Sequence, residues 1–408
     1  VELDPNPPSS GAEPPGEPPG AAVQRQYVVA VDVLTDDSRT GYVTSVPSLD
    51  AGTVANLDSA IEFTGGVNIF GRPERGTFYA APFEEPVIEK WSVGADGRFE
   101  RSDRVSFTNL GVASASNVAY TPLYSDTKSY FTSATDLVIW NPTAMTLVEV
   151  RPVPEEYLQY GAEGPFAVYS VEVLLVRDDL VQLAVIFMDP DEWGHWGEHM
   201  KVINFDPRTD TFMGAVDETR CEWVAARGRK TSDGKTYFST DPSFEFLARA
   251  YGDEYGTRSC GLRVVDPGQS FDAGFDVNLS ELVGGRPAGL VTPVSDDLAY
   301  ISVYHTELLG TDITAETYDS IWASDAPRAF RLWTWHIGDP VANDDVEQEP
   351  SAYGIGGEAQ IVVDDRVFSV DISPDFASWR LLELKPDGTL SPALSGPNRA
   401  ALGVVRVR

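Results

Sequence analysis

Short hairpin turns recur along the whole chain, and their spacing constrains the fold more than any other feature. The segment VINFDPRTDTF at 202–212 is typical, with a hydrophobic run, an Asp-Pro turn and a second run from Thr211. Proline presets φ and aspartate can bond the backbone two residues on, so this segment predicts a β-hairpin. The residues that directly precede such turns are Val46, Val93, Trp140, Phe205, Val265, Ile337 and Leu384.

The seven positions are separated by 47, 47, 65, 60, 72 and 47 residues. A strand–turn–strand signature with a period of about 45 residues is typical of propeller blades, each a four-stranded antiparallel sheet. An aromatic or β-branched strand precedes most turns, as in GTFYAAP, KSYFTSA, LVQLAVIF, GKTYFST, LAYISVY and RVFSVDI. We therefore predict an all-β fold, a seven-bladed β-propeller over residues 26–408, with a pair of β-sandwiches as the alternative. Short helices are expected at 48–61 or 278–283.

Both ends of the chain carry information about its organisation. The C-terminal GVVRVR is expected to pair in one blade with the N-terminal QYVVAVDVL and so to close the ring, which removes open sheet edges. Residues 1–25 are rich in Pro, Gly, Ser and Glu and predict a flexible tether. A start without Met and without a signal peptide fits a processed, exported protein. The tether predicts a lipid anchor at the cell surface or in the periplasm.

The charge of the chain restricts its partners. Its 63 acidic and 30 basic residues give a net charge of −33, which repels nucleic acid and anionic membranes. Solubility is the simplest interpretation of this surplus, and recruitment of a cation or a basic partner is the alternative. The apolar runs are too short to span a bilayer. We expect a monomer with no nucleic-acid partner, and membrane contact only through the N-terminal anchor.

Three long insertions are expected on one face of the propeller. If the turns above join strands three and four of each blade, residues 188–199, 241–259 and 305–328 all connect strand two to strand three. Long loops on one side of a rigid scaffold are typical binding sites. Cys221 and Cys260 are both expected near this face, and we predict a disulfide between them. The bond would either hold a recognition loop in place for binding or order a loop that is too polar to order itself.

The first insertion concentrates histidine, tryptophan and acidic residues. His195 and His199 are four apart, a metal-binding spacing on a helix, but Gly194 and Gly197 argue against a helix. A solvated acidic loop is the preferred interpretation, so no metal and no cofactor is assigned. Trp193 and Trp196 would stack on a flat ligand or a partner surface, or fold back over the blade as a lid.

The third insertion and the strands contain further aromatic side chains. Tyr318 and Trp322 offer the same two alternatives as the tryptophans of the first insertion. Four other tryptophans alternate within strands and are expected in the inter-blade core: Trp91, Trp140, Trp333 and Trp335.

No catalytic motif is present. The chain has no GxSxG, no serine or cysteine at a recognisable spacing from a histidine, and no P-loop lysine after GGVNIFG. We therefore expect a protein that is not an enzyme. A metal-dependent propeller hydrolase, with ligands scattered over several blades, stays as an alternative.

Several segments resemble the MxcI-type lipoproteins of myxobacteria over residues 26–408. They are GYVTSVPSLDAGTV, VIEKWSVGADGRF, KSYFTSATDLVIWNPTAMTL, TRC followed by SCGLRVVDPGQSFDAGFDVNLSELVGG, and RLWTWHIGD. The resemblance implies a surface propeller lipoprotein that works in iron acquisition near siderophore uptake systems. The expected function is capture of a ferric siderophore or another small ligand on the long-loop face. The alternative is a scaffold that binds an envelope protein.

A ferric catecholate is anionic, so its capture requires a basic pocket in this acidic chain. Arg227 and Arg229 lie near the inner strand of the fifth blade, where they would line the channel or pair with local carboxylates. The complete set of candidate ligand- or partner-binding residues is Trp193, His195, Trp196, His199, Arg227, Arg229, Arg249, Arg258, His305, Tyr318, Trp322 and Arg331.

Overall fold

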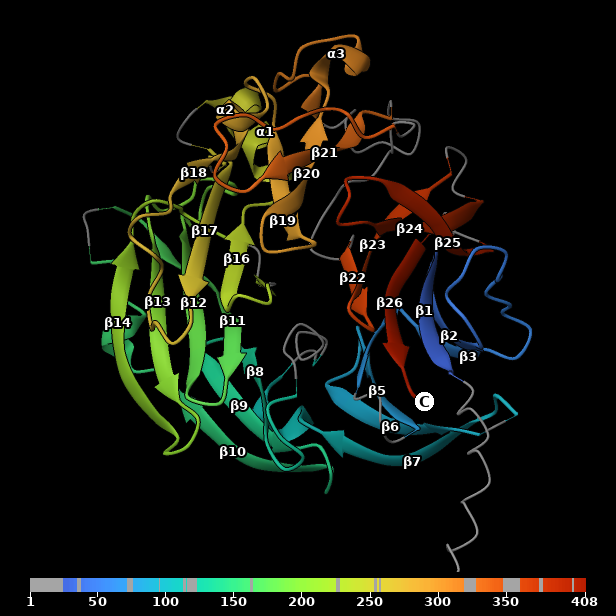
Figure 1. The fold of residues 1–408 in the computed structure, drawn as a ribbon. Coiled ribbons are helices and arrows are strands. Elements are labelled where there is room, and N and C mark those ends of the chain that lie inside the picture. The colour runs from blue at the N-terminus through green and yellow to red at the C-terminus, as the bar shows by residue number, and fades with distance from the viewer. Residues whose placement is uncertain are drawn as a thin grey trace, which may run out of the picture.

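Seven antiparallel sheets surround a central axis and form a seven-bladed β-propeller (Figure 1). The computed structural model describes residues 25–408, apart from 35–37, 72–75, 95, 113–114, 116–122, 162–163, 225–227, 253–254, 257, 319–327, 348–359, 374–376 and 398–399. The predicted tether therefore lies, except for Arg25, outside the described residues. Within them, five sheets have four strands and two have three.

The strands of each sheet run outward from the centre in the following order. The first sheet contains β26 (Ala400–Arg406), β1 (Tyr27–Leu34), β2 (Arg39–Val46) and β3 (Ile61–Thr64). The second contains β4 (Val67–Gly71), β5 (Thr77–Pro82), β6 (Val87–Val93) and β7 (Phe99–Ser106). The third contains β8 (Ser129–Ser133), β9 (Asp136–Asn141) and β10 (Thr146–Pro152). The fourth contains β11 (Ala167–Arg177), β12 (Leu180–Met188), β13 (Met200–Asp206) and β14 (Thr211–Glu218).

The remaining three sheets complete the ring. The fifth contains β15 (Arg229–Lys230), β16 (Lys235–Ser239), β17 (Cys260–Val265) and β18 (Val277–Asn278). The sixth contains β19 (Ala288–Pro293), β20 (Leu298–Tyr304) and β21 (Phe330–His336). The seventh contains β22 (Gln360–Val363), β23 (Arg366–Ile372), β24 (Ser378–Leu384) and β25 (Leu390–Pro397).

The predicted turns mark the ends of the third strands in six sheets and of the middle strand in the third sheet. All seven residues named above lie within one residue of the last residue of β2, β6, β9, β13, β17, β21 or β24. The six predicted preceding strands correspond to β5, β8, β12, β16, β20 and β23, each the strand that directly precedes one of these strands in its sheet. The turn chemistry therefore placed the blade register correctly.

The chain closes its ring with its last strand. β26 pairs antiparallel with β1, from Tyr27 opposite Arg406 to Asp32 opposite Ala400. Backbone hydrogen bonds continue beyond the strands, from the Val407 amide to the Gln26 carbonyl at 2.9 Å. This confirms the predicted blade shared by the two ends, which satisfies the edge groups of β1.

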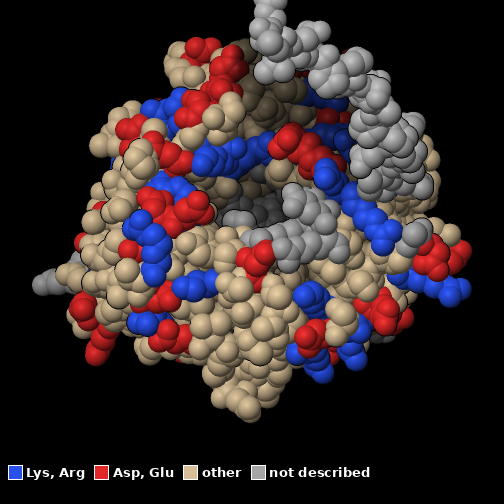
Figure 2. Space-filling model, turned by 60° about the horizontal axis from the view of Figure 1, so that its bottom comes forward, with Lys and Arg blue, Asp and Glu red and all other residues tan. Residues whose placement is uncertain are grey.

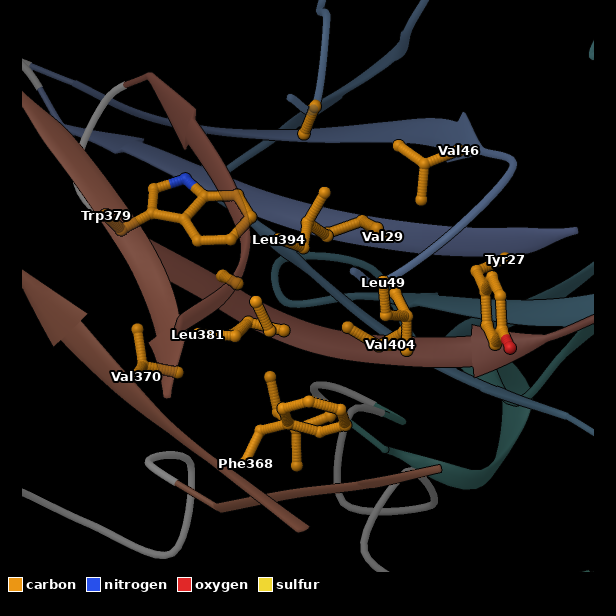
Figure 3. Close-up of a cluster of buried hydrophobic side chains, with 14 of the residues drawn as sticks. Tyr27, Val29, Val46, Leu49, Phe368, Val370, Trp379, Leu381, Leu394 and Val404 are labelled. Atoms are coloured by element: carbon orange, nitrogen blue, oxygen red, sulfur yellow. The ribbon is translucent and has the colours of Figure 1, made fainter. Parts of the chain in front are cut away.

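The buried side chains lie mainly between neighbouring blades. At the closing seam, Trp379 and Leu394 of the seventh sheet pack with Val29 of the first (Figure 3). Of the tryptophans predicted for the inter-blade core, Trp140, Trp333 and Trp335 are buried, whereas Trp91 is only half-buried.

Three short α-helices lie within the described residues: α1 (Pro242–Tyr251), α2 (Leu279–Leu282) and α3 (Thr306–Leu309). Two single 3₁₀ turns accompany them, η1 (Thr108–Leu110) and η3 (Glu155–Tyr157). The expected helix at 278–283 is confirmed by α2, which the Asn278 side chain caps. The expected helix at 48–61 is wrong, because this segment instead bridges the seventh sheet at Asp50 and Val54.

The longest helix, α1, was not predicted, although its signal is present. Asp241 caps the helix by accepting a hydrogen bond from the Ser243 amide at 2.8 Å, and Pro242 occupies the first turn. Glu245 and Arg249 pair one turn apart at 2.6 Å. The Asp-Pro step that makes turns elsewhere therefore starts a helix here.

The three insertions connect second to third strands, as predicted. Residues 188–199 join β12 to β13, residues 241–259 join β16 to β17, and residues 305–328 join β20 to β21. Alternate connections of an antiparallel blade lie on opposite faces, so the described residues of all three insertions lie on one face, which we call the loop face. None of the helices in the described part of the chain is long and apolar enough to cross a bilayer.

Candidate functional site

The insertions of the fourth, fifth and sixth blades contact one another in succession on the loop face. The Gly256 amide donates to the Gly194 carbonyl at 2.8 Å, and the Tyr255 hydroxyl donates to Glu192. On the other side, the rings of Tyr251 and Tyr318 lie 5.6 Å apart. The predicted clustering of the long loops is therefore confirmed.

A pocket of about 580 Å³ opens between the insertions of the fourth and fifth blades. This volume is in the range of small-molecule sites. Its walls combine two aromatic side chains with carboxylates, arginines and hydroxyls. The lining residues are Phe166, His195, Trp196, Glu198, Glu222, Glu245, Ala248, Arg249, Gly256, Arg258, Ser259, Asn278 and Ser280.

Glu222 is a pocket carboxyl with a buried oxygen, Oε2, that lacks a hydrogen-bond partner. Burial raises the pKa of Glu222 above its ordinary value, and the nearby Glu198 adds to the rise, whereas Arg258 opposes it. A carboxyl with a raised pKa that lines a pocket is a candidate for binding or proton transfer.

The disulfide fastens two walls of this pocket to each other. Cys221 and Cys260 are bonded, as predicted, with their Cα atoms 6.1 Å apart. Their chain neighbours Glu222 and Ser259 both line the pocket. The bridge therefore holds the segment that carries Glu222 to the segment that carries Ser259.

Three other ionised groups of the pocket are already paired. Glu245 accepts hydrogen bonds from the hydroxyls of Ser259 and Ser280 and pairs with Arg249 at 2.6 Å. Arg258 pairs with Asp276 at 2.6 Å. Both guanidinium groups thus have carboxylate partners, which leaves little positive charge for an anionic ligand.

The arginines predicted as one basic pocket are therefore not gathered in one place. Only Arg249 and Arg258 line the pocket, whereas Arg229 on β15 and Arg331 on β21 do not. Arg227 lies outside the described residues. Burial lowers the pKa of Arg229 to about 10, and its Nε and Nη1 are buried without partners. Figure 2 shows basic and acidic side chains interspersed around a central hollow, which is consistent with widespread local pairing.

The three histidines named from the sequence have different environments. His195 lines the pocket, with its ring 5.1 Å from that of Phe166. His199 is buried, stacks on Tyr160 at 4.4 Å and contacts the Tyr160 carbonyl at 3.1 Å. His305 lies between Glu307 at 3.0 Å and the Trp333 indole at 3.1 Å, and burial lowers its pKa. His199 and His305 are therefore structural residues with satisfied rings.

The two tryptophans of the first insertion differ in their exposure to solvent. Trp193 is 61% exposed, whereas Trp196 is only 5% exposed and packs against Trp223 and Phe244. Of the two alternatives, Trp196 fits the folded-back one, because its apolar ring is covered by residues of the neighbouring blade. Trp193 alone stays exposed. Tyr318 is half-buried, and Trp322 lies outside the described residues.

Gly256 allows the end of the fifth-blade insertion to lie directly against α1 of the same insertion, beside the pocket. Its φ is +71°, and an added Cβ would collide with the Phe244 carbonyl oxygen and lie 2.7 Å from the Ala248 amide nitrogen. We predict that Gly256→Ala destabilises the fold by about 2 kcal/mol or more, because backbone atoms must move.

The matched control for this substitution is Gly310→Ala. Gly310 has a similar φ of +76° but nothing within 4 Å of an added Cβ. It therefore reports the backbone strain alone. Equal midpoints for the two variants in chemical denaturation would show that the close approach at Gly256 is unimportant.

Comparison with known proteins shows the fold. No protein-family profile matches the chain, and no curated protein matches its sequence. A candidate 6-phosphogluconolactonase from Bacteroides uniformis is similar in structure, with a TM-score of 0.52 and 9% identity, covering 94% of this chain and 100% of that one. A periplasmic gluconolactonase from Pseudomonas aeruginosa has a TM-score of 0.52 and 11% identity, covering 94% and 99%.

These two structures overturn the expectation that the chain is not an enzyme. Both are named as lactonases and share the fold, so the lack of a local motif in this chain does not argue against catalysis. In a propeller, catalytic groups can come from separate blades and leave no sequence motif. At these identities, the likeness itself concerns the fold alone.

Proposed function

We propose that the protein binds a small polyhydroxylated ligand in the loop-face pocket. The observation that carries this proposal is the Glu222 carboxyl, which has a buried acceptor oxygen without a partner. An unsatisfied buried acceptor is costly, so a ligand hydroxyl that donates to Glu222 gains more than an ordinary surface hydrogen bond.

The other walls narrow the chemistry of the ligand. The pocket carries three carboxyls against two arginines, and both arginines already have carboxylate partners. This balance favours a neutral or cationic ligand over an anion such as a ferric catecholate. Phe166 and Trp196 supply an apolar wall, which suits the C–H face of a sugar ring.

Titration calorimetry with glucose, gluconate and a ferric tris-catecholate tests the proposal. We expect glucose to bind one-to-one in the pocket, gluconate to bind more weakly, and the ferric complex not to compete. Glu222→Gln is expected to weaken binding about tenfold, because a charge-assisted hydrogen bond is lost. The affinity of the wild type for glucose should fall as the pH drops through the raised pKa of Glu222. Glu222→Gln should not show this pH dependence.

A matched control is Glu316→Gln. This substitution removes the same charge from an exposed position in the sixth-blade insertion. It should leave binding unchanged. Tight binding of the ferric complex, or equal glucose binding by wild type and Glu222→Gln, would refute the proposal.

Turnover of a sugar lactone is the second candidate, favoured by the raised pKa of Glu222. The Glu222 carboxylate would take a proton from a water molecule while the water oxygen adds to the carbonyl carbon of the lactone. The ring C–O bond then breaks, and the proton passes to the leaving ring oxygen. Hydrolysis of glucono-δ-lactone above the buffer rate, lost in Glu222→Gln, would support it. Binding without hydrolysis would limit the site to ligand capture.

A further inference from the structure

The fourth-blade insertion brings three metal-ligating side chains to one point. Asp189, Glu192 and His195 each contribute one ligand atom, and these atoms all lie within 4.8 Å of one another. The His195 Nδ1 is 3.7 Å from both Asp189 Oδ2 and Glu192 Oε2. A tetrahedral or octahedral ion with bonds of about 2.1 Å separates its ligand atoms by about 3.0–3.4 Å, so small side-chain movements suffice.

The ligand atoms are those that the protein leaves unused. The His195 Nδ1 is buried and has no hydrogen-bond partner, although the side chain as a whole is 25% exposed. The other oxygens of the two carboxylates are already engaged. Asp189 Oδ1 accepts from the Asp191 amide at 2.9 Å, and Glu192 Oε1 accepts from the Tyr255 hydroxyl.

A protonated histidine between two carboxylates accounts less well for this arrangement. An imidazolium N–H would approach a carboxylate oxygen to about 2.7–2.9 Å, whereas both oxygens stand 3.7 Å away. The two equal separations of 3.7 Å are too long for such hydrogen bonds, yet they keep the three ligand atoms within reach of one ion.

We propose that Asp189, Glu192 and His195 bind one divalent transition-metal ion. One imidazole and two carboxylates suit Zn²⁺, Mn²⁺ or Fe²⁺, whereas Ca²⁺ and Mg²⁺ prefer oxygen ligands alone. Three protein ligands leave positions open for water or another ligand. His199, the partner suggested by sequence spacing, is not a ligand, because its ring stacks on Tyr160.

Calorimetry with Zn²⁺, Mn²⁺ and Ca²⁺ at physiological ionic strength tests the site in the full chain without any sugar. We expect one equivalent of Zn²⁺ or Mn²⁺ to bind, and Ca²⁺ to bind much more weakly. Asp189→Asn and Glu192→Gln should each weaken the tighter ion about 100-fold, since each removes a charged ligand. His195→Ala should abolish stoichiometric binding.

Asp191→Asn is the matched control. It removes a charge from an exposed side chain of the same loop that faces no ligand atom, so affinity should stay within about twofold of wild type. If His195→Ala does not fold, the two carboxylate variants still decide the question. The absence of one-to-one binding, or binding that survives both of them, would overturn the proposal. Because no sugar is present, this outcome is independent of the pocket ligand.

Discussion

Replacing Cys221 and Cys260 together with alanine will lower the free energy of unfolding by about 4 kcal/mol. The bridge spans a sequence separation of 39 residues, and its main effect is to restrict the unfolded chain. Both half-cystines are fully buried, so the alanines also leave a small cavity. Chemical denaturation without reductant measures the difference.

The same variant tests the role of the bridge at the pocket. Glu222 and Ser259 are neighbours of the two cysteines, so the segments that carry them should be held together less firmly once the bridge is lost. We expect weaker glucose binding under conditions in which the variant is still folded. A loss below about 1 kcal/mol, with unchanged binding, would show that the disulfide neither stabilises the fold nor positions the pocket.

Trp379→Ala will destabilise the ring at its closing seam by about 3–5 kcal/mol. Trp379 is 2% exposed and packs with the first sheet across the seam (Figure 3). Its indole N–H donates to the Pro397 carbonyl at 3.0 Å. The substitution leaves a large cavity and an unsatisfied carbonyl where the two ends of the chain meet.

Trp193→Ala is the control for this measurement, because Trp193 is 61% exposed in the fourth-blade insertion. It should change the unfolding free energy by less than about 0.5 kcal/mol. Equal effects of the two substitutions would mean that packing at the seam does not limit the stability of the ring.

The fold could be predicted because its signals are local. An Asp-Pro or Asn-Pro turn specifies a hairpin within a few residues. In the strands on either side, the alternation of apolar and polar residues fixes which side chains face the core. Once Phe205 and Val265 were placed at the ends of third strands, the topology alone put the 241–259 insertion on the loop face.

The site could not be predicted in the same way, because its properties depend on contacts between blades. Trp193 and Trp196 are equivalent in sequence, and only the packing of Trp223 and Phe244 decides which of them is covered. The sequence gives no sign that Arg258 is paired, because its partner Asp276 lies 18 residues further along the chain.

Two features carried a usable local signal. Asp241 followed by Pro242 is a helix start as well as a turn, and the buried Phe246 four residues later favours the helix. For the proposed metal site, the useful spacing is that of Asp189, Glu192 and His195, which follow one another at intervals of three residues. The spacing between His195 and His199 was misleading.

The pairing of β26 with β1 leaves Gln26 and Arg408 joined by backbone hydrogen bonds. A short peptide joining these two residues would therefore make the backbone circular from residue 26 onward. The point at which the chain starts could then be changed without changing how the blades pack. Such a chain could be cut instead at the 206–211 hairpin, between β13 and β14, and the circular permutant would retain the same inter-blade contacts. The seam would then move from the first blade to the fourth.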